Sequence, residues 1–217
     1  MDAWVQLNVQ PVTYRRFLEL QQLLNLQKQE HLAQAVGENL AEIACQVVEQ
    51  VFGYLSQISA AQAQFESEHT VEQIIATLEK HLPWSMQLLN HERLSNLVND
   101  LALRMSVQQG QVWLKYPIPM PLATELHHYN QQLTEPQHIA QVFTLIIEII
   151  DHGVTELIRN PKKSLKFNFV VDKSLAGVIG LTTQLGYKRL EKMGRQLNAE
   201  QAQAYLDHFL HFIPQQH

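Results

Sequence analysis

The widest apolar pattern in the chain runs from residue 136 to residue 159. The segment Thr134-Glu-Pro-Gln137 is typical of a helix start, with Thr134 as the cap and proline in the first turn, and Asn160-Pro161 would end the helix. Its apolar positions are Ile139, Val142, Phe143, Leu145, Ile146, Ile147, Ile149, Ile150, Val154, Leu157 and Ile158. Because a helix this apolar contacts neighbours on most sides, we predict that it lies at the centre of a bundle.

Apolar residues recur at helical spacing in most of the remaining chain. We expect further helices over 11–28, 31–59, 70–82, 86–105, 122–133, 172–197 and 198–212. A capping box at Thr70 would start one of them, Pro83 would end or restart it, and the next would break near Asn90. A second box, from Asn198 to Gln201, would start the last helix.

The segment 109–121 interrupts the helical pattern. Gln109-Gly110 indicates a turn, and residues 111–116 alternate weakly, as an edge strand would. Prolines at 117, 119 and 121 exclude a helix there. We therefore predict a short extended crossover near 111–120 and take 109–121 as the candidate internal boundary. Residues 1–10 are expected to form a loose lead-in.

These patterns predict an all-α fold, a multi-helix bundle of about seven to nine helices forming a single domain over residues 1–217. The composition agrees with this prediction. The chain has 27 Gln, a good helix former without charge, and only eight Gly and eight Pro, so turns are sparse.

The expected location is cytoplasmic. No secretory signal pattern is visible near residue 1, and no run reaches the ~18 apolar residues of a membrane span. The single cysteine, Cys45, excludes an intrachain disulfide. It lies in an apolar helical run with no basic residue nearby in sequence, so we expect a buried core thiol.

Charge is distributed unevenly along the chain. Residues 159–195 hold nine of the sixteen Lys and Arg and two acids, a formal charge of +7, whereas the preceding residues sum to −10. The candidate binding residues in this segment are Lys162, Lys163, Lys166, Phe167, Phe169, Lys188, Lys192 and Arg195. Lys188, Lys192 and Arg195 lie near a predicted helix C-terminus, where the helix dipole favours cations. The helix dipole does not explain the lysines of the connector 162–171 in the same way.

We favour a non-enzymatic helical interaction or regulatory protein whose basic C-terminal segment faces an acidic body and binds a protein partner or a second copy. The alternative is a peripheral binder of an anionic membrane surface or of an apolar ligand through the basic amphipathic segment 162–195. Nucleic acid is disfavoured because the chain is acidic overall, with a pI near 6.1.

A metal-binding helical bundle is the third hypothesis. Glu-x-x-His occurs three times, at Glu66, Glu125 and Glu135, but in contexts that do not suit a carboxylate-bridged site. Glu148 and His152, four residues apart on the apolar helix, are better-placed metal candidates, but we favour a solvent-facing strip or a satisfied buried pair over a metal site. We expect no cofactor and find no catalytic or phosphate-binding motif.

Overall fold

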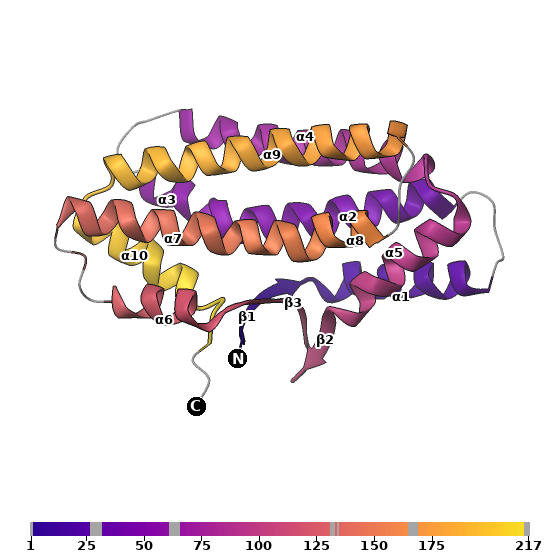
Figure 1. The fold of residues 1–217 in the computed structure, drawn as a ribbon, viewed down its shortest axis with the longest axis horizontal. Coiled ribbons are helices and arrows are strands. Elements are labelled where there is room, and N and C mark those ends of the chain that lie inside the picture. The colour runs from indigo at the N-terminus through magenta and orange to yellow at the C-terminus, as the bar shows by residue number, and fades with distance from the viewer. Residues whose placement is uncertain are drawn as a thin grey trace.

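The computed structural model of the protein describes residues 2–26, 32–60, 66–130, 133, 135–164 and 169–214. Within these ranges the side chains of residues 56, 59, 60, 66–68, 162, 164, 169–172, 174 and 175 are not described. Helices make up most of the described residues, and a small sheet lies at one side of them (Figure 1). The predicted mostly helical fold is confirmed.

The helices are α1 (Pro11–Asn25), α2 (Leu32–Val48), α3 (Tyr54–Ala60), α4 (Glu66–Gln87), α5 (His91–Leu103), α6 (Met120–His128), α7 (Pro136–Val154), α8 (Asn160–Ser164), α9 (Phe169–Gln196) and α10 (Ala199–Leu210). Two π-helical turns, η1 (Glu49–Gly53) and η2 (Thr155–Arg159), join α2 to α3 and α7 to α8. Counted through these turns, the described residues form eight continuous helices, within the predicted seven to nine.

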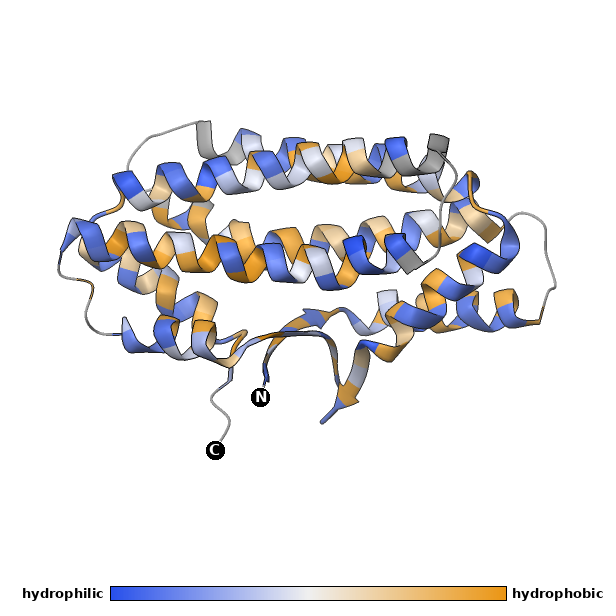
Figure 2. Ribbon diagram, in the orientation of Figure 1, coloured by the Kyte–Doolittle hydropathy of each residue, from blue (hydrophilic) through white to orange (hydrophobic). Residues whose placement is uncertain are grey.

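Four long helices form the bundle. Close contacts link α2 with α4, α4 with α9, and α9 with α7. In Figure 1, α4 and α9 form the upper layer and α2 and α7 the layer below it. Figure 2 shows that α7 is apolar over most of its length, and α7 packs against α6, α9, α10 and β3 (Gln111–Pro119). Its predicted central position is therefore confirmed.

The sheet has the strand order β1-β3-β2, where β1 is Asp2–Val9 and β2 is Met105–Gln108. Both pairings are antiparallel. The extended segment predicted near 111–120 is confirmed as β3, but β3 is the central strand and not an edge strand. The predicted lead-in over 1–10 is wrong, because residues 2–9 alternate between outward and buried positions and pair with β3 along their whole length.

The predicted helix around Thr70 also differs in its boundaries. Helix α4 begins at Glu66 and continues through Pro83 to Gln87. Gly37 of α2 allows this, since a Cβ there would lie 2.4 Å from the Pro83 Cα, and close packing holds α4 on both sides of the proline. The predicted break at Asn90 is confirmed, because its side chain caps α5 by accepting the Arg93 N–H at 3.0 Å.

The predicted end of the apolar helix at Asn160-Pro161 is wrong. The helix passes through η2 into α8, and the Asn160 N–H donates to the Thr155 carbonyl across the π turn. Proline has no backbone N–H, so Pro161 cannot donate a helical hydrogen bond. The π turn η2 lies directly before it and changes the hydrogen-bond spacing of the helix at this point. At the other end, Glu135 is the N-cap residue of α7, and Thr134 lies outside the described residues.

The last helix follows its prediction closely. Asn198 and Gln201 form the reciprocal capping box of α10. Helix α9, in contrast, begins at Phe169, earlier than the predicted start at residue 172. None of the described helices combines the length and apolarity that crossing a bilayer requires.

Strand β3 contributes to two hydrophobic clusters. Tyr116 and Ile118 belong to the cluster built around α7 and α10, whereas Val112 and Leu114 belong to the cluster around α1, α2 and α5. The candidate boundary segment 109–121 therefore runs from one cluster to the other, and a division of the chain at this point stays a prediction.

Candidate functional site

An apolar cavity of about 270 Å³ lies inside the bundle. The long helices line it with Leu40, Ile43, Ala44, Val47 and Val48 of α2, Ile74, Leu78, Leu82 and Met86 of α4, Ile150 and Val154 of α7, and Val178 and Ile179 of α9. Leu97 and Leu101 of α5 and Leu114 of β3 complete the apolar wall. The cavity is thus surrounded by elements from across the chain.

Both π-helical turns border this cavity. Val51 and Phe52 of η1 line it, as do Leu157 and Ile158 of η2. A π turn adds a residue to a helical turn and is found frequently at functional sites, because it redirects the side chains that follow. Two such turns on two different helices at one cavity distinguish it from a packing gap between regular helices.

Gly186 of α9 brings Phe52 close to the backbone of the opposite wall. A Cβ at position 186 would lie 2.9 Å from the Phe52 Cζ, so a larger residue would push the ring. Since Gly186 and Phe52 both line the cavity, the absence of a side chain at position 186 sets where the ring lies and how much space remains.

Four polar side chains lie in the described lining: Asp100, Thr182, Thr183 and Tyr187. The threonine hydroxyls donate to helix carbonyls, Thr182 to Val178 at 2.8 Å and Thr183 to Ile179 at 2.7 Å. The Tyr187 hydroxyl donates to the Asp151 carboxylate at 2.8 Å. The few polar groups of the cavity are therefore held in fixed orientations, as in a binding site that orients its ligand.

The Asp151 carboxylate joins α7, η2 and α9. Besides Tyr187, it accepts from one Arg159 guanidinium nitrogen at 2.8 and 2.9 Å, and the same nitrogen donates to the Thr155 hydroxyl at 3.0 Å. Burial and then the hydrogen bond to Asp151 raise the pKa of Tyr187 well above its ordinary value. The phenol therefore stays protonated and keeps donating to Asp151 across the neutral pH range.

The cavity lining reaches solvent at Asp100 of α5, whose side chain is 42% exposed, and at Ile158 of η2, which is 39% exposed. We call the edge of the cavity at Asp100 its mouth. Arg104, which caps the end of α5, lies 3.5 Å from Asp100 and 3.5 Å from Glu156 of η2. Both contacts are longer than the ~2.7–2.9 Å of a strong charge-assisted hydrogen bond. Arg104, which does not itself line the cavity, thus links Asp100 loosely to Glu156.

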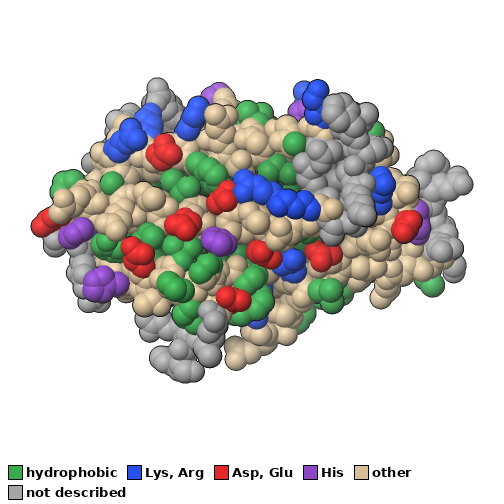
Figure 3. Space-filling view, viewed as in Figure 1, with side chains coloured by type: hydrophobic (Ala, Val, Ile, Leu, Met, Phe, Trp, Pro, Cys, Tyr) green, Lys and Arg blue, Asp and Glu red, His purple; other side chains and the backbone are tan. Residues whose placement is uncertain are grey.

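The sequence-predicted basic residues lie apart from this lining. Lys163, Lys188, Lys192 and Arg195 are exposed. Lys162 lies in α8 and Phe169 starts α9, but their side chains are not described, and Lys166 and Phe167 lie outside the described residues. On the face shown in Figure 3, described basic and acidic side chains are interspersed.

Two carboxylates of α2 in the acidic part of the chain, which was expected to face the basic segment, bind to α1. The Glu38 carboxylate pairs with Arg16 of α1 at 3.1 Å, and the Glu42 carboxylate accepts the Thr13 hydroxyl at 2.6 Å. These two carboxylates of α2 therefore join it to α1. It is the other face of α9, with Val178, Ile179 and Tyr187, that enters the interior of the bundle.

The metal candidates are not brought together with further ligands. Glu148 is exposed and His152 is partly buried on α7. Among the described residues, no group of three His, Cys, Asp or Glu side chains is placed to hold an ion. The arrangement described here thus offers a metal ion at most a single pair of side chains.

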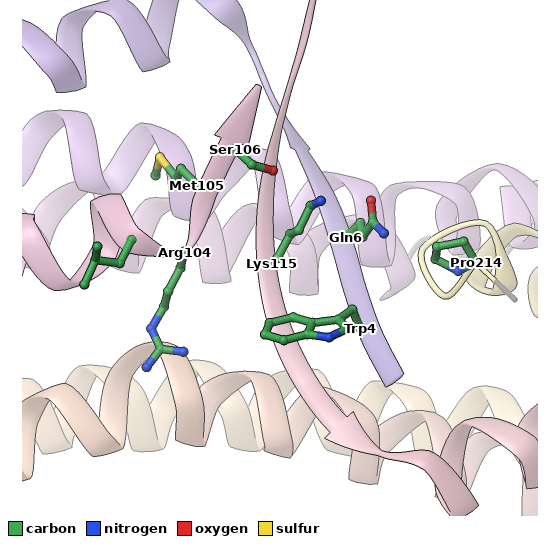
Figure 4. Close-up of a pocket in the computed structure, with 8 residues that line it drawn as sticks. Trp4, Gln6, Arg104, Met105, Ser106, Lys115 and Pro214 are labelled. Atoms are coloured by element: carbon green, nitrogen blue, oxygen red, sulfur yellow. The ribbon is translucent and has the colours of Figure 1, made fainter. Parts of the chain in front are cut away.

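The sheet carries a second hollow, an open groove of about 510 Å³. Figure 4 shows Trp4 and Gln6 of β1 and Lys115 of β3 on its floor, with Arg104, Met105 and Ser106 on one side and Pro214 on the other. Trp4 and Leu103, which also lines the groove, are 42% and 87% exposed. Solvent therefore reaches the apolar side chains of this groove.

Comparisons with protein-family models, with curated proteins and with solved structures found no significant match for this chain.

Proposed function

We propose that the protein binds a small lipophilic molecule in the cavity between α2, α4, α7 and α9. The observation that carries this proposal is the apolar cavity of about 270 Å³. An apolar cavity of ~150 Å³ is enough to bind benzene, and typical ligand sites begin near ~300 Å³. A bicyclic aromatic ring or a short branched hydrocarbon matches this volume.

The cost of such a cavity supports the same proposal. Protein interiors are close-packed, and voids larger than a water molecule are few. Apolar space that is left unfilled forfeits packing contacts, so it lowers the stability of the fold. An apolar occupant would restore part of those contacts.

The proposal follows the apolar-ligand alternative of the sequence analysis, but with different residues. The predicted site was the basic surface of segment 162–195, whereas the proposed site uses the opposite side of α9 together with α2, α4 and α7. The exposed lysines then have no direct contact with the ligand.

Calorimetric titration with 1-methylnaphthalene tests the proposal, because this probe is apolar, bicyclic and without a polar head. Ala44 lines the cavity, so Ala44→Phe should fill it and weaken binding at least tenfold. Ala176 is exposed on α9, and Ala176→Phe is the matched control that should bind like the unmodified protein. Circular dichroism melting checks that both variants are folded.

The proposal fails if the unmodified protein gives no saturable binding. It also fails if Ala44→Phe and Ala176→Phe, both folded, bind the probe equally well, because the probe would then lie elsewhere.

A second candidate function is the binding of a protein segment in the groove of the sheet. The supporting observation is the exposure of Trp4 and Leu103 beside Arg104 and Lys115. Aromatic and cationic side chains at one concave surface suit a peptide that carries both apolar and acidic residues.

Selection from a displayed peptide library tests this candidate. Enriched peptides should be acidic, and Leu103→Ser should weaken their binding, whereas Leu181→Ser should not, since Leu181 is exposed on α9 away from the groove. Enrichment of basic peptides, or equal effects of the two substitutions, would contradict it.

A further inference from the structure

The polar side chains of the described cavity lining share one chemical property: they accept hydrogen bonds and have no hydrogen left to donate. A carbonyl or carboxylate oxygen can only accept, so the hydroxyl in each contact must be the donor. Thr182 and Thr183 therefore point their only polar hydrogens at the Val178 and Ile179 carbonyls, and each threonine oxygen is left with lone pairs alone.

Tyr187 is oriented in the same way. Its hydroxyl hydrogen is committed to the Asp151 carboxylate at 2.8 Å, and the raised pKa of the phenol keeps that hydrogen in place. The fourth polar side chain of the described lining, Asp100, is a carboxylate. A ligand that reaches these groups meets acceptors, and one that carries acceptors itself gains no hydrogen bond from these side chains.

The charges at the mouth favour the same kind of ligand. Asp100 and Glu156 contribute two negative charges and Arg104 one positive charge, so this group of three carries −1. Asp151 and Arg159 form a separate pair that is neutral overall. A carboxylate that is 42% exposed at the edge of an apolar space can attract a cation without being fully desolvated.

We propose that the ligand of the cavity is a lipophilic amine, with an apolar body among α2, α4, α7 and α9 and a protonated amino group at Asp100 near the mouth. The amino group supplies only donors and one positive charge, which complements the acceptors and the net −1 charge of the mouth. This inference rests on the proposed function and adds the chemical class of the ligand to it.

Three ligands that share one body test the head-group preference: 1-naphthylmethylamine, 1-methylnaphthalene and 1-naphthoate. Their affinities are measured by calorimetry at pH 7 with the full chain. We expect the amine to bind at least tenfold more tightly than the carboxylate, with the hydrocarbon between them. Equal affinities, or tighter binding of the carboxylate, would overturn the inference.

A charge-neutralising pair of variants tests the role of Asp100. Asp100→Asn keeps the shape of the side chain but removes its charge and adds donors, so the amine-to-carboxylate affinity ratio should fall about tenfold. Glu148→Gln is the matched control, since Glu148 is exposed on α7 and does not line the cavity. If both variants leave the ratio unchanged, Asp100 does not bind the head group and the inference is wrong.

The two proposals fail in different ways. Saturable binding of 1-methylnaphthalene that Ala44→Phe abolishes supports the cavity as a ligand site whatever the head group. If that result is accompanied by no preference for the amine, only the inference about the ligand class is lost. If 1-methylnaphthalene does not bind at all, the proposed function itself is lost.

Discussion

Cys45 shows how strongly the position of one residue determines its chemistry. It is buried on α2 and directly follows the cavity-lining Ala44 in the sequence. Burial, and then the negative charges of Glu79, Glu49 and Glu42, raise the pKa of its thiol to about 11. The predicted buried core thiol is thus confirmed, and the surrounding charges make it less reactive still.

This shift predicts slow thiol labelling. The thiolate is the reactive form, and raising the pKa lowers its population, so at pH 8 only about a thousandth of the native thiol would be ionised. Reaction with 5,5′-dithiobis(2-nitrobenzoate), followed by absorbance, should be at least about 100-fold slower in the native protein than in the unfolded chain at that pH. Similar rates would show that the thiol is accessible and not held at a raised pKa.

The cavity residues were only partly predictable from the sequence. The apolar periodicity identifies part of the wall, because Ile150 and Val154 belong to the predicted apolar helix. Thr182, Thr183 and Tyr187 were missed, although they follow Val178 and Ile179 at i+4 and later positions on the same side of α9. Their position as polar residues within an apolar helical stripe is the sequence pattern that would have identified these three residues.

At the scale of helices, close crossings depend on particular glycines. Gly194 of α9 lies against Phe143 of α7, where an added Cβ would be 2.9 Å from the Phe143 Cβ. By contrast, Gly177 and Gly180 have nothing within 4 Å of an added Cβ among the described atoms. The glycines of α9 therefore differ in whether the helix needs them for a close contact.

This contrast predicts opposite effects of one substitution within one helix. Gly194→Ala should lower the free energy of unfolding by about 1–3 kcal/mol, because the Phe143 Cβ is fixed close to its own helix backbone and cannot move aside. Gly177→Ala should raise it by up to about 1 kcal/mol, since alanine has the higher helix propensity and meets no neighbour. Urea unfolding measures both, and a stabilising Gly194→Ala would contradict the described α7–α9 contact.

Helix boundaries were predictable where the capping chemistry is local. Asn90 and Asn198 were identified correctly because their side chains bond to backbone groups three residues away. Pro83 and Pro161 were misread as helix ends, since tight packing at Gly37 and the π turn at η2 are tertiary and backbone features without a local sequence signal.

At the scale of the whole molecule, the three-stranded sheet is the largest feature that the sequence did not predict. Strand β1 alternates between outward and buried residues over its eight positions. Its partner β3 lies more than a hundred residues later, so no local sequence pattern indicates the pairing. The count of helices and the central position of α7 were predictable, because apolar periodicity depends only on neighbouring residues.

The stability of the whole molecule should depend on the occupant of the cavity. At a free ligand concentration of 100 times Kd, binding adds about 2.7 kcal/mol, which corresponds to a rise in Tm of roughly 5–10 °C for a chain of this size. We expect the unmodified protein and Ala176→Phe to show this rise with 1-naphthylmethylamine and Ala44→Phe to show little. Differential scanning calorimetry measures it, and an equal rise in all three would contradict binding in the cavity.

The pairing of β1 with β3 also has a consequence for how the chain reaches its native state. Residues 2–9 are synthesised more than a hundred residues before their partner strand, which at ~5–20 residues per second is an interval of roughly 5–20 s. During that interval Ala3, Val5, Leu7 and Val9 have no strand beside them to complete the sheet. Helices α1, α2 and α4 can form locally during that interval, whereas β1 can pair only after β3 has been made, so the sheet should form after these helices.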